Sequence, residues 1–192
     1  MSREGLPQLV MRRPNLDGLP QLLLPTGYQL RCFQDGGQEG GQEGDQEGWN
    51  EVMELAFEWE PGQADFETMM LSDSAYTPER VKVAVTAQGQ VVATASCWPA
   101  ARFDDDHRTL HYVATHPDHR GQRLGFQVSL AAMYQAAAEG GRSMVLLTDD
   151  FRDAAIKTYL RMDFVPLCMH MSHAPRWRLI QARLGTSVPV DE

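Results

Sequence analysis

The sequence of 192 residues has no hydrophobic run approaching the roughly 20 residues that a membrane-spanning helix needs. Its first residues, Met-Ser-Arg-Glu-Gly-Leu-Pro, lack the apolar stretch of a secretory signal, so we expect a cytoplasmic protein with no membrane partner. The three cysteines, Cys32, Cys97 and Cys168, form no Cys-x-x-Cys pair, which argues against a disulfide framework or a zinc site. The sequence therefore predicts no metal.

Basic residues are also scarce, since 17 Lys and Arg stand against 26 Asp and Glu for a net charge of −9. General nucleic-acid binding needs a basic surface that neutralises phosphates, so we exclude nucleic acid as a partner. Hydrophobic residues make up 43% and charged residues 22%, as in an ordinary globular domain. The length is sufficient for one domain with a hydrophobic core.

Proline and glycine indicate how the chain is organised. Four prolines within residues 1–26 predict an extended N-terminal arm rather than regular structure. Residues 36–48 repeat Gly-Gln-Glu and can bury little apolar area, so we expect a flexible low-complexity loop. This loop falls inside a domain predicted over residues 27–174, and residues 175–192 are expected to form a C-terminal helix and tail.

Hydrophobic periodicity predicts an α/β fold with a central mixed, twisted sheet of about six strands flanked by helices. The pattern predicts a strand over residues 109–116, a helix over 123–139 and a strand over 143–148. Such a strand–helix–strand unit makes two parallel strands joined by a right-handed crossover. The other predicted strands are 28–33, 81–86, 91–98 and 164–171, and the other predicted helices are 49–59, 64–71 and 153–162.

The segment from His111 to Gly125 runs from a predicted strand through a glycine-bearing loop into a predicted helix. Gly121 and Gly125 remove side chains where a ligand could meet the backbone, and the first turn of the helix offers unpaired N–H groups. Arg120 and Arg123 add positive charge, so the segment suits a diphosphate. Spacing alone equally fits a tight turn with surface arginines, and the segment is neither a Walker loop nor a dinucleotide fingerprint.

This segment resembles motif A of the GNAT acetyltransferases, in which Val-x-Pro-x-x-Arg-Gly-x-Gly-x-Gly is typical. The sequence departs from the motif at Arg123, where glycine is usual; we expect this residue to be helical and to contribute only its N–H. The resemblance implies that the strand backbone contacts the acetyl-pantetheine arm of acetyl-CoA through Val113, Ala114 and Thr115. It also implies that the loop holds the pyrophosphate through Arg120, Gly121, Gln122, Arg123, Leu124 and Gly125.

Residues 152–164 resemble motif B of the same family, typically Asn-x-x-Ala-x-x-x-Tyr-x-x-x-Gly-Phe, with Ala155 matching. Arg152 stands where asparagine is usual and Asp163 where glycine is usual. The resemblance implies a GNAT-like sheet splayed between strands 109–116 and 143–148, with Arg152 and Ala155 beside the coenzyme. It implies an enzyme that moves an acetyl group from acetyl-CoA to an amine of a small molecule or peptide by direct transfer.

The altered positions keep an alternative open, a non-catalytic acyl-CoA-binding module. An exposed sheet edge or the C-terminal helix could also support a homodimer.

Tyr159 and His111 are the candidate catalytic residues. In the family, the tyrosine that Tyr159 matches points at the coenzyme sulfur and acts as the acid; otherwise it is a half-buried tyrosine with a backbone partner. His111 has an intrinsic pKa of about 6.5, which suits a general base. It shares a strand face with Val113 and Thr115. A satisfied structural histidine is the competing interpretation.

Overall fold

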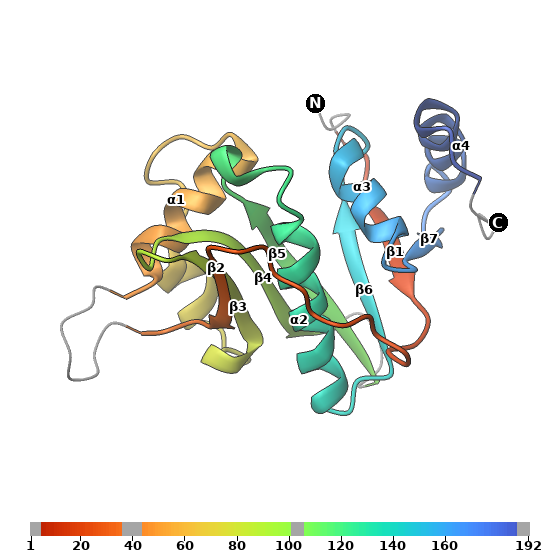
Figure 1. Ribbon diagram of the computed structural model, residues 1–192. Helices are drawn as coiled ribbons and strands as arrows, with labels where there is room; N and C mark the ends of the chain where they lie inside the picture. Colours follow the sequence, from red (N-terminus) through yellow and green to blue (C-terminus); the bar gives the residue numbers. More distant parts are fainter. Residues whose placement is uncertain (1–4, 36–43, 101–105, 188–192) are drawn as a thin grey trace.

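The computed structural model describes residues 5–35, 44–100 and 106–187, which fold around a seven-stranded sheet (Figure 1). The strand order is β2-β3-β4-β5-β6-β1-β7, with antiparallel neighbours except for the parallel pair β5–β6. The mixed sheet predicted from the sequence is therefore confirmed, with one strand more than expected. The strands are β1 Leu9–Arg13, β2 Tyr28–Cys32, β3 Val81–Thr86, β4 Val91–Pro99, β5 His107–Thr115, β6 Ser143–Thr148 and β7 Val165–Leu167.

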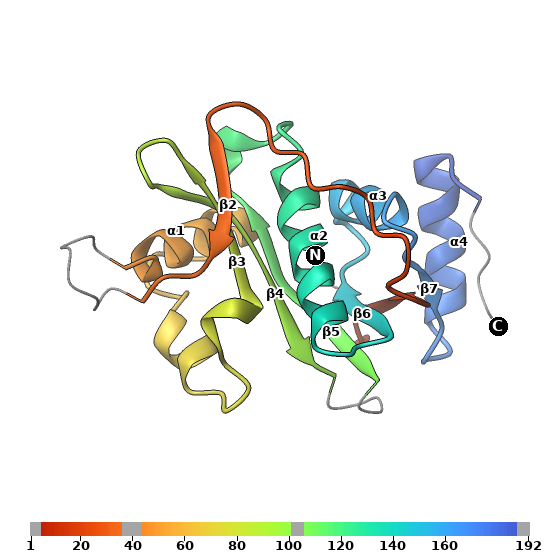
Figure 2. The ribbon, with the colours of Figure 1, turned by 60° about the horizontal axis from the view of Figure 1, so that its bottom comes forward.

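Helices cover both faces of the sheet because alternate strand residues point to opposite sides. On one side, Val83 packs into a cluster around Trp49, which belongs to α1 (Gln46–Phe57). On the other side, the adjacent Ala84 packs into a cluster with Leu130 of α2 (Leu124–Ala138). Figure 2 shows α2 lying along the sheet from a second direction. The remaining helical segments are η1 Glu67–Leu71, η2 Pro78–Arg80, η3 Pro117–His119, α3 Asp153–Leu160 and α4 His173–Leu184.

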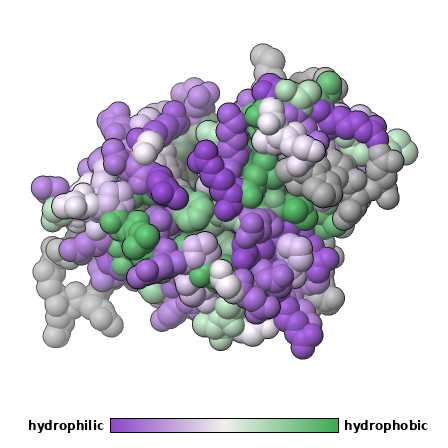
Figure 3. Space-filling model, turned by 45° about the vertical axis from the view of Figure 1, so that its right-hand side comes forward, coloured by the Kyte–Doolittle hydropathy of each residue, from purple (hydrophilic) through white to green (hydrophobic). Residues whose placement is uncertain are grey.

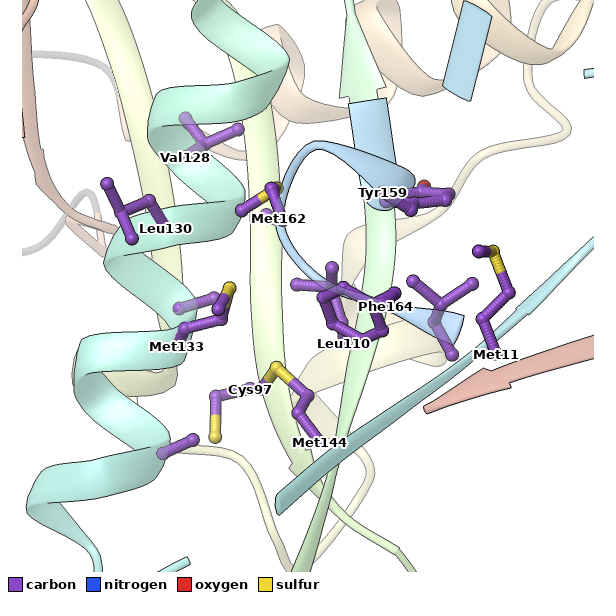
Figure 4. Close-up of a cluster of buried hydrophobic side chains, with 14 of the residues drawn as sticks. Met11, Cys97, Leu110, Val128, Leu130, Met133, Met144, Tyr159, Met162 and Phe164 are labelled. Atoms are coloured by element: carbon purple, nitrogen blue, oxygen red, sulfur yellow. The ribbon is translucent and has the colours of Figure 1, made fainter. Parts of the chain in front are cut away.

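The sheet splits between β5 and β6, as the sequence resemblance predicts. These strands pair only from His107↔Ser143 to Thr109↔Val145, and then diverge toward their carboxyl ends (Figure 1). Below the split, Cys97, Leu110 and Met144 join the two halves in one apolar cluster (Figure 4). Above it, the carboxyl ends of two parallel strands lie at the same edge, the place where open α/β sheets bind ligands.

The N-terminal arm is more ordered than the sequence predicts. Leu9–Arg13 form β1, which pairs with both β6 and β7 and makes β7 part of the sheet. Leu9 and Met11 are fully buried, so apolar burial outweighs the effect of the surrounding prolines. The prediction of an arm without regular structure is therefore wrong for these five residues.

Two other predictions need adjustment. The loop predicted over residues 36–48 ends earlier, because α1 begins at Gln46; residues 36–43 lie outside the described part of the chain. The helix predicted over residues 64–71 is a single π-helical turn, η1. In the described ranges no helix has both the length and the apolar character to cross a membrane.

Candidate active site

β5 carries a bulge at the point where it leaves β6. Its register with β4 steps from Ser96↔His111 to Thr94↔Ala114, so Tyr112 and Val113 oppose Ala95 alone. Tyr112 has φ 47°, a left-handed conformation that non-glycine residues seldom adopt. A bulge frees backbone groups from the ladder. The strand segment expected to contact the acetyl-pantetheine arm is therefore irregular, and its irregularity starts at Tyr112, one residue before Val113.

The loop after β5 brings open N–H groups to the same edge. The turn η3 leads through Arg120, Gly121, Gln122 and Arg123, all exposed, into α2. No side chain caps α2, so the N–H groups of its first turn remain available to an anion. The next two residues have different surroundings. Leu124 is buried, and a Cβ at Gly125 would lie 3.0 Å from Oγ1 of Thr115, so glycine lets the helix approach the strand closely.

Arg123 is not helical, contrary to the prediction from the sequence. It precedes α2 with φ 60° and ψ 17°, a left-handed conformation, and its side chain is exposed. Its guanidinium carbon lies 5.4 Å from the centroid of the Phe126 ring. The backbone here favours the glycine that the motif usually has. Asp163, the other residue that replaces a glycine, has φ 59° and binds the buried Arg13 through an ion pair of 2.8 Å.

Arg152 lies on the other side of the split, just before α3. Its guanidinium carbon is 4.1 Å from the ring centroid of Phe57 in α1, and its Nε is 3.3 Å from Oδ2 of Asp149. A single side chain thus links a helix of one sheet half to a loop of the other. Ala155 is half-buried and packs against the apolar cluster that contains Leu130 of α2.

On the face seen in Figure 3, hydrophobic side chains lie between more hydrophilic ones near the middle of the molecule.

His111 lies on β5 immediately before the bulge, and its surroundings keep it neutral. Burial lowers the pKa of His111 below its usual value, against a smaller upward effect of the Asp73 carboxylate. Its Nδ1 is buried and has no hydrogen-bond partner among the described residues. The ring lies 3.8 Å from that of Tyr112 and 6.4 Å from that of Trp98, measured between centroids. A neutral imidazole of this kind can accept a proton.

Tyr159 lies on α3 at the edge of the apolar cluster (Figure 4). Only 7% of the residue is exposed, and burial raises the pKa of its hydroxyl to about 12. No described residue forms a hydrogen bond with that hydroxyl. The competing interpretation, a structural tyrosine, expected the hydroxyl to bond a backbone group. A phenol with this pKa stays protonated at neutral pH, so it can donate a hydrogen bond to an anion.

Sequence reasoning missed Asp73 and Trp98. Asp73 follows η1, and its Oδ2 accepts a hydrogen bond of 2.9 Å from Nε1 of Trp98 on β4. Its Oδ1 accepts another of 2.8 Å from the Ala75 N–H. These hydrogen bonds, chiefly that from Ala75, lower the pKa of Asp73 and keep it ionised. No local pattern identifies this carboxylate, because only the tertiary fold brings η1 to β4.

Comparisons with known proteins agree with this geometry. The sequence model described as the acetyltransferase (GNAT) family matches residues 48–164, which is more than half of the chain. The mycothiol acetyltransferase of Actinosynnema mirum is 28% identical over 160 residues, covering 81% of this chain and 50% of the relative. The mycothiol acetyltransferase of Nocardia farcinica is 24% identical over 162 residues, covering 81% of this chain and 51% of that relative. The chain thus spans about half the length of the curated relatives it matches.

Among solved structures, a GCN5-related N-acetyltransferase from Sphaerobacter thermophilus has the same fold, with a TM-score of 0.63. It is 22% identical, and the match covers 84% of this chain and 50% of that protein. No three His, Cys, Asp or Glu side chains are grouped as metal ligands within the described ranges.

Proposed function

The chain belongs to the GNAT acetyltransferase family, and on that basis we propose that it moves an acetyl group from acetyl-CoA to an amine by direct transfer. One observation carries the proposal: the carboxyl ends of β5 and β6 separate beside the uncapped N-terminus of α2. Such an arrangement binds an extended ligand with an anionic end, because the split admits the ligand and the helix N-terminus attracts its phosphates.

In this proposal the coenzyme lies along β5 and the loop that follows it. Backbone groups of Val113, Ala114 and Thr115 hold the pantetheine arm, and the bulge supplies an N–H to the thioester oxygen. The pyrophosphate lies against residues 120–125, where Arg120 and Arg123 add positive charge. Arg152 and Ala155 border the opposite side of the arm.

Two side chains are proposed for the proton transfers. His111 accepts a proton from the attacking amine, directly or through a water molecule, because its lowered pKa leaves it neutral at pH 7. The tetrahedral intermediate then collapses, the C–S bond breaks, and the Tyr159 hydroxyl stabilises the departing thiolate. A phenol with a pKa of about 12 acts better as a hydrogen-bond donor than as a full proton donor to a thiol with a pKa of about 8.5.

The test is release of free CoA thiol from acetyl-CoA, measured with and without a panel of primary amines, with the acetylated product identified by mass. We expect amine-dependent thiol release. The alternative, a non-catalytic acyl-CoA-binding module, requires binding of acetyl-CoA without thiol release for any amine.

A further inference from the structure

We propose that Asp73 binds a second, non-reacting ammonium group of the acceptor, so that the preferred acceptor is a small dication of the diamine type. This inference rests on the function proposed above and names a substrate class for it. The indole of Trp98 joins the two parts of the site: its Nε1 donates to Asp73, and its ring lies 6.4 Å from the His111 ring between centroids.

Asp73 is an anion without a cationic partner. No Lys or Arg side chain of the described ranges forms an ion pair with it. Of the charged groups, His111 lowers its pKa most and Arg80 comes next, and the Arg80 guanidinium is bound to Glu139 and to the carbonyl of Ala75. Each of its two oxygens accepts one hydrogen bond, which fixes the carboxylate and leaves lone pairs for a ligand. A fixed, exposed carboxylate beside aromatic rings suits an ammonium group.

The reacting amine cannot be the group that Asp73 holds. An adjacent carboxylate stabilises the protonated form of an amine, and a protonated amine does not attack a thioester. His111 is neutral and lies beside the bulge, so it is the better neighbour for the reacting nitrogen. Two subsites that both adjoin one indole therefore fit two nitrogens separated by a few carbon atoms.

The charge of the surrounding segment supports a dication. Residues 44–79, which include α1 and η1, contain 10 of the 26 acidic residues and no Lys, Arg or His. The loop expected to hold the coenzyme instead carries Arg120 and Arg123. A surface divided in this way attracts a cationic acceptor and an anionic coenzyme to different sides.

The experiment compares three acceptors with the same four-carbon scaffold: putrescine, butylamine and γ-aminobutyrate, which differ in charge at the far end. With the full chain and acetyl-CoA, we expect kcat/KM to be highest for putrescine and lowest for γ-aminobutyrate. Asp73→Asn should reduce the putrescine-to-butylamine ratio about tenfold, the effect of one charge-assisted hydrogen bond, and leave butylamine within about threefold of its original rate. Asp73→Glu should restore part of the ratio.

The matched control is Asp65→Asn. Like Asp73, Asp65 accepts a hydrogen bond from the backbone N–H two residues further along the chain, that of Glu67. The Asp65→Asn substitution removes one negative charge from the same segment, as Asp73→Asn does. We expect this variant to keep the ratio. An unchanged ratio in Asp73→Asn, an equal loss for putrescine and butylamine, or equal ratios in both variants would overturn the inference.

Failure of the proposed function gives a different result. If no amine is acetylated, that function is wrong, and calorimetry of putrescine binding to the CoA-bound protein still decides this inference. Binding that disappears in Asp73→Asn and persists in Asp65→Asn supports the subsite; binding that is absent or equal in both overturns it.

Discussion

At the scale of single residues, the Tyr159 hydroxyl makes the most direct prediction. Tyr159→Phe keeps the ring, which packs against Phe164 with centroids 6.0 Å apart, so stability should change little. If the hydroxyl meets the sulfur only as negative charge develops, kcat and kcat/KM should fall together by roughly 10- to 1,000-fold. Steady-state kinetics and unfolding curves on the same preparation provide the measurement. A loss of stability with unchanged turnover per folded molecule would assign Tyr159 a structural role.

The neutral His111 predicts a particular pH dependence. Because its pKa lies below 6.5 in the folded protein, kcat/KM should stay level down to that pH and fall only as the pH drops through the lowered value. His111→Gln should remove this acidic limb and reduce kcat/KM by about 10²- to 10⁴-fold. His170→Gln is the control, since His170 lies in the connection before α4 and bonds Ser172. An unchanged limb in His111→Gln would transfer the base role to another group.

Arg123 and Asp163 both have a left-handed backbone conformation, but replacing each with glycine should have opposite effects on stability. Arg123→Gly relieves an unfavourable φ of 60° and removes no described hydrogen bond, so the free energy of unfolding should rise by up to about 1 kcal/mol. Asp163→Gly relieves a similar strain but removes the carboxylate that pairs with the buried Arg13, so this variant should be less stable than the original protein.

Chemical denaturation measures both effects. CoA affinity should remain within tenfold in Arg123→Gly if only the backbone of residue 123 binds phosphate. A decrease in stability for this variant would show that the arginine side chain compensates for its backbone conformation.

At the scale of elements, the uncapped start of α2 predicts how the coenzyme loop responds to substitution. Gly125→Ala places a Cβ 3.0 Å from Oγ1 of Thr115, which should weaken CoA binding modestly by moving helix and strand apart. Gly125→Glu adds a negative charge where phosphate would bind, and should abolish measurable binding. Calorimetric titration of both variants with CoA separates crowding from charge. Equal affinities for Ala and Glu would remove the helix N-terminus from the pyrophosphate site.

Elements with a long apolar run between clear turn residues are the ones that the sequence predicted well. The apolar strand Ser143–Thr148 has the predicted bounds, and α2 begins and ends within one residue of its prediction. β1 was missed because it has five residues between prolines and ends in Arg12 and Arg13, with no alternating pattern. The Asp73 site was missed because hydrogen bonding between a loop and a distant strand has no local signal.

At the scale of the whole molecule, the proposed coenzyme would contact both halves of the split sheet. Binding to the folded state alone should therefore stabilise the entire domain, by about 2.7 kcal/mol at a concentration of one hundred times Kd. A single shifted transition in a thermal unfolding scan with CoA is the expected result. Two transitions, of which only one responds to CoA, would show that the halves unfold independently.

The position of β1 has a consequence for the order in which the protein assembles. This strand comprises residues 9–13, yet its two neighbours are residues 144–148 and 165–167, so both neighbours are synthesised long after it. The antiparallel pairs β3–β4 and β4–β5 can form earlier, because these three strands follow one another closely in the sequence. Leu9 and Met11 must therefore remain exposed to solvent or to a chaperone during synthesis, and insertion of β1 would be a late step of folding.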